Sequence, residues 1–280
     1  MDQARLDRRL KYLAAVNGQG PEELRSAPQA RGYLKMMDDA RAMMDSPVKR
    51  AFNYRAEEKA ETIAAYEPRI APAEILDPTY YYGQRFGHGL LLARRLVEAG
   101  ARFIQVEYQY GPFKGFDMHE NGSRRMREMK RQIDQPIGQL IRDLDQRGLL
   151  DRTLVVIATE FGRTIASQPA AGVEPEGDAE RHNGENLVIE SERMFGFHGH
   201  FSSVNTMLFF GGGFKRGFVY GRTADRHPMV AVENPVELID VYATIYRALG
   251  IAPNHNYITE GRPFYVTKDG KGRPIEALLA

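Results

Sequence analysis

The spacing of hydrophobic and polar residues predicts helices over much of the chain. Residues 1 to about 67 have mostly helical patterning, and apolar residues follow a 3.6-residue period over 87–99 and over 235–249, each ended by a glycine. A longer amphipathic stretch covers about 122–147 and contains Pro136, where we expect a bend. The chain therefore begins with a helical segment and carries three further helices.

Short apolar runs between these helices predict strands. Residues 103–108 form one run, 206–210 form another, and the continuous run 154–157 is typical of a strand buried on both faces of an α/β sheet. Because a long helix separates the first run from the run at 154–157, we expect a βαβ unit with parallel strands. The predicted fold is α/β, a mainly parallel sheet with helices on both faces, with an N-terminal helical segment over 1–82 and the α/β part over 83–280.

Composition narrows the possible functions. The chain has 280 residues, a formal net charge of +1 and 27% charged residues, so nothing in its charge indicates a nucleic acid partner. It has no apolar run long enough for a membrane span, and its first residues, MDQARLDRRLKYL, do not form a signal peptide. It has seven histidines and no cysteine, which excludes disulfides, thiol nucleophiles and thiolate metal sites.

Polar side chains stand in three clusters beside the ends of predicted strands: Asp117 with His119, Glu160 with Arg163, and His198 with His200. In open α/β sheets, ligands bind outside the carboxyl ends of the strands. Carboxylates and imidazoles are donors that suit a divalent cation, which polarises a phosphoryl, sulfuryl or carbonyl group. We expect Arg163 to orient an anionic substrate through its planar guanidinium.

Each cluster also has a purely structural interpretation. Asp117 and His119 can be a turn followed by a surface histidine, and Glu160 and Arg163 can be an ion pair that closes the turn. One of the two histidines in the third cluster can be structural. The run Gly211–Gly213 is better explained as a turn at a strand end than as a phosphate loop, because the spacing of phosphate-binding motifs is missing.

Five segments together resemble the domain of unknown function 1501 family, which looks like a branch of the alkaline phosphatase/sulfatase superfamily. In chain order they read GHGLLLARRLVEAGARFIQV, FDMHEN, LIRDLDQRGLLDRTLVVIATEFGRT, FFGGGFKRGFVYGRT and VENPVELIDVYATIYRALGI. The resemblance covers about 83–280. It implies an alkaline-phosphatase-like fold and a metal-dependent hydrolase of phosphate or sulfate esters.

The resemblance also implies a set of metal ligands. Asp117 and His119 correspond to an Asp/His pair, Glu160 to the acidic ligand after the central strand, and His198, or with less support His200, to the last ligand. The cofactor would be zinc, calcium or manganese. The substrate would be a small anionic ester or a sulfated or phosphorylated glycan.

Departures from the family pattern leave a second function open. Phe161 stands where the superfamily often has a histidine. Phe197, and not an aspartate, directly precedes His198. The Gly- and Asp-rich segment that members carry upstream is missing before Gly83, which favours a chain that is part of a longer protein. An export signal, common in the family, would be lost with that segment. The alternative is a non-catalytic protein of the same fold that binds a partner or an anionic glycan.

Overall fold

The computed structural model describes residues 3–19, 22, 27–46, 48–75, 78–109, 111, 115–119, 122–163, 200–225 and 230–280. The chain divides into two compact units, residues 1–57 and 58–280. The expected boundary after residue 82 falls inside the second unit. Tyr66 and Ile70, which precede that expected boundary, are both buried.

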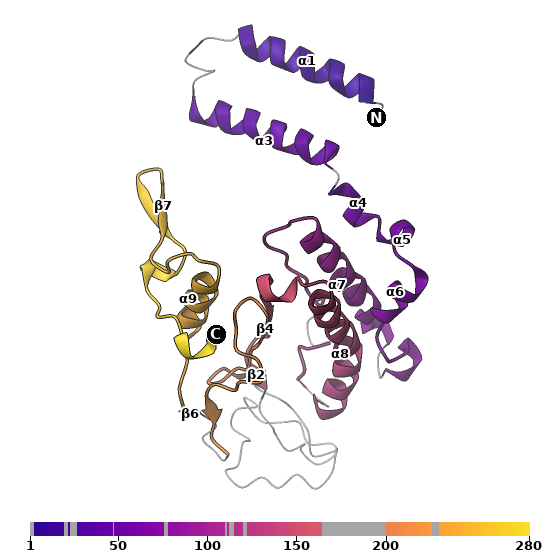
Figure 1. Ribbon diagram of the computed structural model, residues 1–280, viewed down its shortest axis with the longest axis vertical. Helices are drawn as coiled ribbons and strands as arrows, with labels where there is room; N and C mark the ends of the chain where they lie inside the picture. The colour runs from indigo at the N-terminus through magenta and orange to yellow at the C-terminus, as the bar shows by residue number, and fades with distance from the viewer. Residues whose placement is uncertain are drawn as a thin grey trace, which may run out of the picture. The chain divides into compact units, whose positions relative to one another are not determined.

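The first unit is helical. It contains α1 (Gln3–Gln19), α3 (Pro28–Asp45), α4 (Lys49–Phe52) and α5 (Tyr54–Glu57), as Figure 1 shows. Proline is well suited to the first turn of α3 because its missing N–H has no partner there. Within this unit the guanidinium Nε of Arg50 donates to Oε1 of Glu57 at 2.9 Å.

The second unit begins with α6 (Ala60–Ala65) and is built on two long helices, α7 (Gly83–Glu98) and α8 (Gly122–Gln146), which lie side by side (Figure 1). The apolar spacing predicts both helices, and α8 continues through Pro136. The side chains buried around this pair are mainly aliphatic: Ile70, Leu90, Leu91, Met129, Leu140 and Leu144. The pair therefore encloses a hydrophobic core.

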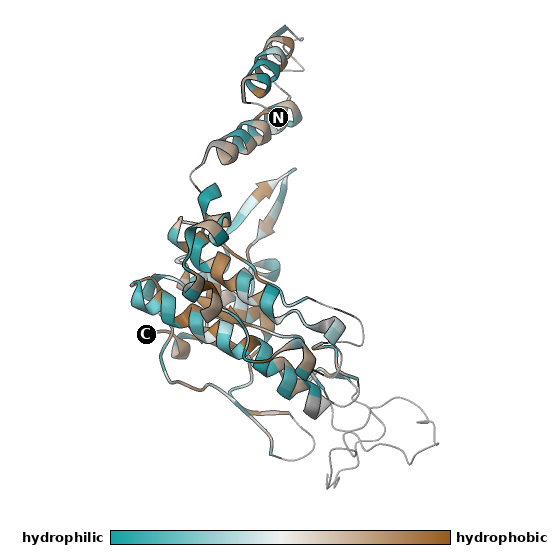
Figure 2. Cartoon of the chain, turned by 90° about the vertical axis from the view of Figure 1, so that its right-hand side faces the viewer, coloured by the Kyte–Doolittle hydropathy of each residue, from teal (hydrophilic) through white to brown (hydrophobic). Residues whose placement is uncertain are grey.

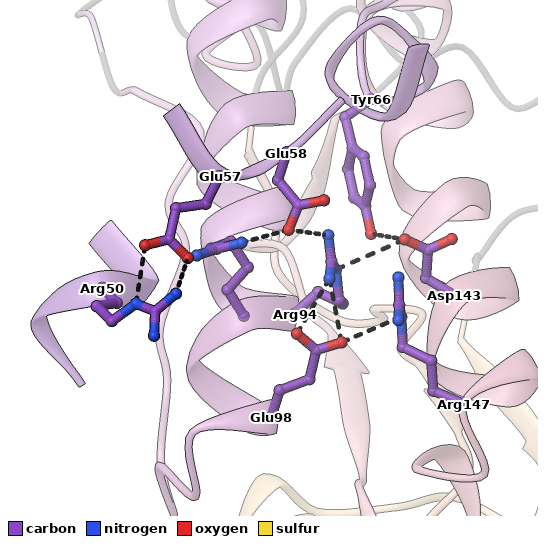
Figure 3. Close-up of polar contacts among 9 residues, drawn as sticks. Arg50, Glu57, Glu58, Tyr66, Arg94, Glu98, Asp143 and Arg147 are labelled. Carbon is purple, nitrogen blue, oxygen red and sulfur yellow. Dashed lines mark hydrogen bonds and ion pairs between the residues drawn. The ribbon is translucent and has the colours of Figure 1, made fainter. Parts of the chain in front are cut away.

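A buried ion-pair network also joins these helices (Figure 3). The side chain of Arg94 on α7 is 3% exposed, and its Nη1 donates to both oxygens of Glu98 at 3.0 Å. Its Nη2 lies 2.9 Å from Oε1 of Glu58, and its Nε lies 3.6 Å from Oδ2 of Asp143 on α8. Neither of these last two ion pairs is a hydrogen bond. Arg94 therefore depends on the charges of three carboxylates.

Among the residues that the structure describes, the strands form four antiparallel pairs. These are β1 (Val155–Ile157) with β4 (Leu208–Phe210), β2 (Gly162–Arg163) with β3 (His200–Phe201), β5 (Arg222–Thr223) with β6 (Ala231–Glu233), and β7 (Asn256–Thr259) with β8 (Arg262–Tyr265). In the first pair Val156 is opposite Phe209, so the two short apolar runs of the sequence contact each other.

This arrangement differs from the expected βαβ unit. Residues 103–108 alternate between exposed and half-buried side chains, but they join no ladder with another described residue. The run at 154–157 is half-buried and pairs antiparallel with β4. A short apolar run is compatible with parallel or antiparallel pairing. Which of the two forms depends on a partner strand that is distant in sequence. A mainly parallel sheet is thus not seen among the described residues, and the alkaline-phosphatase-like fold stays a prediction.

The C-terminal part packs around α9 (Leu238–Ala248), with three-residue 3-10 turns η6 (Lys268–Gly270) and η7 (Glu276–Leu278). The hydroxyl of Thr244 accepts from the backbone N–H of Ile275 at 2.9 Å, which fixes the chain end to α9. Hydrophobic residues lie on both strands of the β7–β8 hairpin, where Ile258 is 65% exposed (Figure 2). The remaining 3-10 turns are η1 (Pro72–Glu74), η2 (Pro78–Tyr80) and η3 (Leu150–Arg152). No described helix is both long and apolar enough to cross a membrane.

Candidate functional site

Asp117 and His119 form a contact within one short segment. Nε2 of His119 lies 3.1 Å from Oδ1 of Asp117. The His119 side chain is 31% exposed, and the Asp117 side chain is 15% exposed. Met118 between them is buried at 3% exposure. Burial of the middle residue therefore anchors the segment and leaves the two polar side chains partly accessible.

Arg163 joins this pair from a strand that is remote in sequence. Its Nη2 donates to Oδ1 of Asp117, and its Nη1 lies 3.3 Å from Nε2 of His119, a residue 44 positions earlier. The guanidinium side chain is 17% exposed. The structure therefore brings together three of the predicted site residues, and we call Asp117, His119 and Arg163 the polar cluster.

The β2–β3 ladder places two aromatic rings beside the polar cluster. Arg163 is opposite His200 in the register, and the His200 ring lies 6.1 Å from the His119 ring between centroids. The Phe161 ring lies 4.7 Å from the His200 ring, and the guanidinium carbon of Arg163 lies 5.8 Å from the Phe161 centroid. Phe161 precedes Arg163 by two residues, as expected for side chains on one face of an extended chain.

In the sequence, His200 has less support as a ligand than His198, and Phe161 stands out only as a departure from the superfamily pattern. The period-2 relation between Phe161 and Arg163 was visible in the sequence. The pairing of Arg163 with His200 was not, because it depends on a ladder between distant segments.

The Glu160 side chain makes no hydrogen bond or ion pair with the polar cluster. The residue is exposed, and it makes no side-chain hydrogen bond or ion pair with another described residue. Its backbone carbonyl accepts from the hydroxyl of Thr159 at 2.9 Å, and the Thr159 carbonyl accepts from the Asn205 amide at 2.8 Å. The expected Glu160–Arg163 ion pair is replaced by the Asp117–Arg163 ion pair. His198 lies outside the described residues.

The donors of the polar cluster suit part of a cation site. Asp117 Oδ1 and His119 Nε2 lie 3.1 Å apart, so one cation could contact both atoms. Oxygen and imidazole donors together suit zinc or manganese. Within the described residues, however, no three His, Asp or Glu side chains are grouped closely enough to hold a metal. The polar cluster thus offers two ligands, and the His200 ring lies 6.1 Å from the His119 ring between centroids.

The hydrogen-bond roles in the polar cluster conflict. Nε2 of His119 faces a carboxylate oxygen and a guanidinium nitrogen, and a guanidinium nitrogen can only donate. Nε2 can donate to Asp117 when protonated or accept from Arg163 when unprotonated, but it cannot do both. A cation bound to Oδ1 and Nε2 would remove this conflict, because both atoms would then offer lone pairs.

Comparison with known proteins identifies a family but no activity. The model of the family described as "Protein of unknown function (DUF1501)" matches residues 1–279. The match therefore includes 1–82, which lie outside the stretch over which the sequence resembles the family. No curated protein and no solved structure matches the chain.

Proposed function

We propose that this chain, which belongs to the DUF1501 family, is a divalent-metal-dependent hydrolase of phosphate or sulfate esters. The observation that carries the proposal is the polar cluster. A carboxylate oxygen, an imidazole nitrogen and a guanidinium, drawn from segments more than 40 residues apart, lie within hydrogen-bond distance of one another.

Asp117 and His119 are the proposed cation ligands. Both side chains are partly exposed, so a hydrated ion can reach them, and the buried Met118 holds the segment in place. When bound, the cation would polarise the ester group or lower the pKa of a water molecule. His200, whose ring centroid lies 6.1 Å from that of His119, is the proposed proton-transfer group.

Arg163 is the proposed anion-binding group. Its planar fork matches the oxygens of phosphate and sulfate esters. Strand β2 fixes its backbone, and Phe161 lies beside the guanidinium, so the side chain stays on the face of the ribbon that carries His200. The roles of Glu160 and His198 as ligands stay predictions, since the polar cluster does not depend on them.

Metal content and ester hydrolysis test the proposal together. The purified chain is loaded with zinc or manganese, dialysed, assayed for bound metal, and then assayed with p-nitrophenyl phosphate and p-nitrophenyl sulfate. We expect stoichiometric metal and turnover, both lost in Asp117→Asn and His119→Gln. Asp151→Asn is the matched control, because the Asp151 side chain is 88% exposed and lies outside the polar cluster.

Glu160→Gln is a further variant, which we expect to keep bound metal because Glu160 makes no contact with the polar cluster. Loss of metal in Glu160→Gln would restore Glu160 as a ligand. A wild-type chain that shows neither bound metal nor turnover would overturn the proposal. That result would favour the non-catalytic alternative, a protein that binds a partner or an anionic glycan.

A further inference from the structure

Arg163 occupies the two atoms that the proposed cation would use. Its guanidinium donates to Oδ1 of Asp117 and lies 3.3 Å from Nε2 of His119. An arginine stays positively charged at every accessible pH, so it cannot yield this place by losing a proton. The guanidinium and a divalent cation therefore compete directly for the carboxylate.

We infer that Arg163 is an exchangeable counter-ion, which neutralises Asp117 in the cation-free site and moves to the anionic substrate when the cation binds. This inference rests on the proposed function. It assigns Arg163 two alternative partners, so cation and anion must bind with positive coupling. By linkage, each then strengthens the other's affinity by the same factor.

The surroundings of Arg163 allow such an exchange. The Phe161 ring lies 5.8 Å from the guanidinium carbon and offers a cation–π contact on the same face of the β2–β3 ribbon. The backbone of Arg163 is held by its pairing with His200, so only the side chain has to move. With 17% of its side chain exposed, the guanidinium can be reached by a solvated anion.

The charges of the polar cluster also indicate the class of substrate. Asp117 and Arg163 together are neutral when His119 is unprotonated, and a bound divalent cation leaves a charge of about +2 on the polar cluster. A phosphate monoester carries about −1.5 to −2 at neutral pH, whereas a sulfate monoester carries a single negative charge. The released guanidinium and the cation therefore match a phosphate monoester better than a sulfate ester.

Cation binding with and without an anion tests the inference by a readout other than activity. Mn²⁺ affinity of the full chain is measured by the electron paramagnetic resonance signal of free Mn²⁺, alone, with inorganic phosphate and with sulfate. We expect phosphate to tighten Mn²⁺ binding by about tenfold, and sulfate to do so less. In Arg163→Gln we expect tighter Mn²⁺ binding without anion and no coupling to phosphate.

Two further variants serve as controls. Arg163→Lys keeps the positive charge and should keep weaker coupling, while Arg152→Gln removes an exposed arginine of η3 and should behave as wild type. Circular dichroism checks that each variant is folded. If Arg163→Gln does not fold, the coupling in the wild type and in Arg163→Lys carries the test.

The possible failures are distinguishable. A wild-type chain that binds Mn²⁺ with the same affinity in the presence and absence of phosphate overturns the inference but leaves the proposed function standing. An unchanged Mn²⁺ affinity in Arg163→Gln overturns it as well, because the competition would then be absent. A wild-type chain that binds neither Mn²⁺ nor zinc overturns the proposed function, and the inference with it.

Discussion

The hydroxyl of Tyr66 donates a hydrogen bond to Oδ2 of Asp143 at 2.9 Å, across 77 residues of sequence. Tyr66 has no exposed surface, and Asp143 is 7% exposed. The other oxygen of Asp143 accepts from the side-chain amide of Gln139 at 2.7 Å. This contact therefore joins the segment after α6 to α8 inside the ion-pair network of Figure 3.

Removal of the Tyr66 hydroxyl should weaken this contact between the segment after α6 and α8. Tyr66→Phe keeps the ring but leaves a buried carboxylate with one hydrogen bond fewer, so we expect a loss of about 1–2 kcal/mol in the free energy of unfolding. Urea unfolding followed by circular dichroism measures it. Tyr257→Phe, at a side chain that is 60% exposed, is the control and should match the wild type. Equal stability of both variants would contradict the expectation.

Arg94 should be the most sensitive position of the network. Arg94→Met keeps much of the side-chain volume but leaves Glu58, Glu98 and Asp143 without their shared cation, and we expect a cost of about 3–5 kcal/mol. Thermal and urea unfolding measure the loss. In the control, Arg222→Met removes an exposed ion pair with Glu233 and should produce no measurable change. Wild-type stability in Arg94→Met would show that the network does not hold the helices together.

Gly87 on α7 is closely approached by the backbone. A Cβ added there would lie 1.9 Å from the carbonyl oxygen of Tyr66, which cannot move aside as a side-chain end can. We expect Gly87→Ala to lower the free energy of unfolding by about 2 kcal/mol or more. At Gly138 on α8 the nearest atom is the flexible end of Arg142 at 3.3 Å, so Gly138→Ala should stabilise the helix by up to about 1 kcal/mol.

Urea unfolding of the two alanine variants therefore gives effects of opposite sign. Equal destabilisation by both would mean that the close approach of the Tyr66 backbone to α7 has no energetic consequence. Far-ultraviolet circular dichroism before unfolding checks that both variants keep their helix content.

Alkaline pH should destabilise the second unit. Burial raises the pKa of Tyr108 to about 12, and burial together with the charge of Asp143 raises the pKa of Tyr66. An unfolded tyrosine ionises near pH 10. The stability that the neutral Tyr108 hydroxyl contributes is therefore complete below about pH 10 and is lost as the pH rises towards 12.

Urea unfolding at a series of pH values, with tyrosinate absorbance measured in parallel, checks this window. Tyr108→Phe should show a shallower decline above pH 10, because a hydroxyl with a raised pKa is gone. An unfolding midpoint that stays constant from pH 9 to about 12 would contradict the expectation.

Local patterns predicted the helices well. Apolar spacing over 87–99 and 235–249 located α7 and α9, and α8 continues through Pro136, a buried residue. The helical patterning expected over residues 1 to about 67 is interrupted between α5 and α6, where Lys59 is extended and Glu58 contacts Arg94. These contacts depend on tertiary structure, which local spacing does not contain.

The sequence predicted the composition of the candidate site better than its pairing. Asp117, His119 and Arg163 all stand near predicted strand ends, and the structure places them in contact. Glu160, chosen by the same reasoning, faces solvent. Side chains alternate along an extended segment, so residues an odd number of positions from Arg163 point away from the polar cluster. The partner strand β3, which brings in His200, is not specified by any local pattern.

The position of Glu58 determines how the chain can be dissected for separate expression. It is the first residue of the second unit, and its carboxylate pairs with both Arg94 and Arg95 on α7. A fragment that starts at residue 83 would lose Glu58 and the Tyr66 ring, and would leave Asp143 without its phenol partner. A fragment designed to fold independently should therefore begin at or before Glu58.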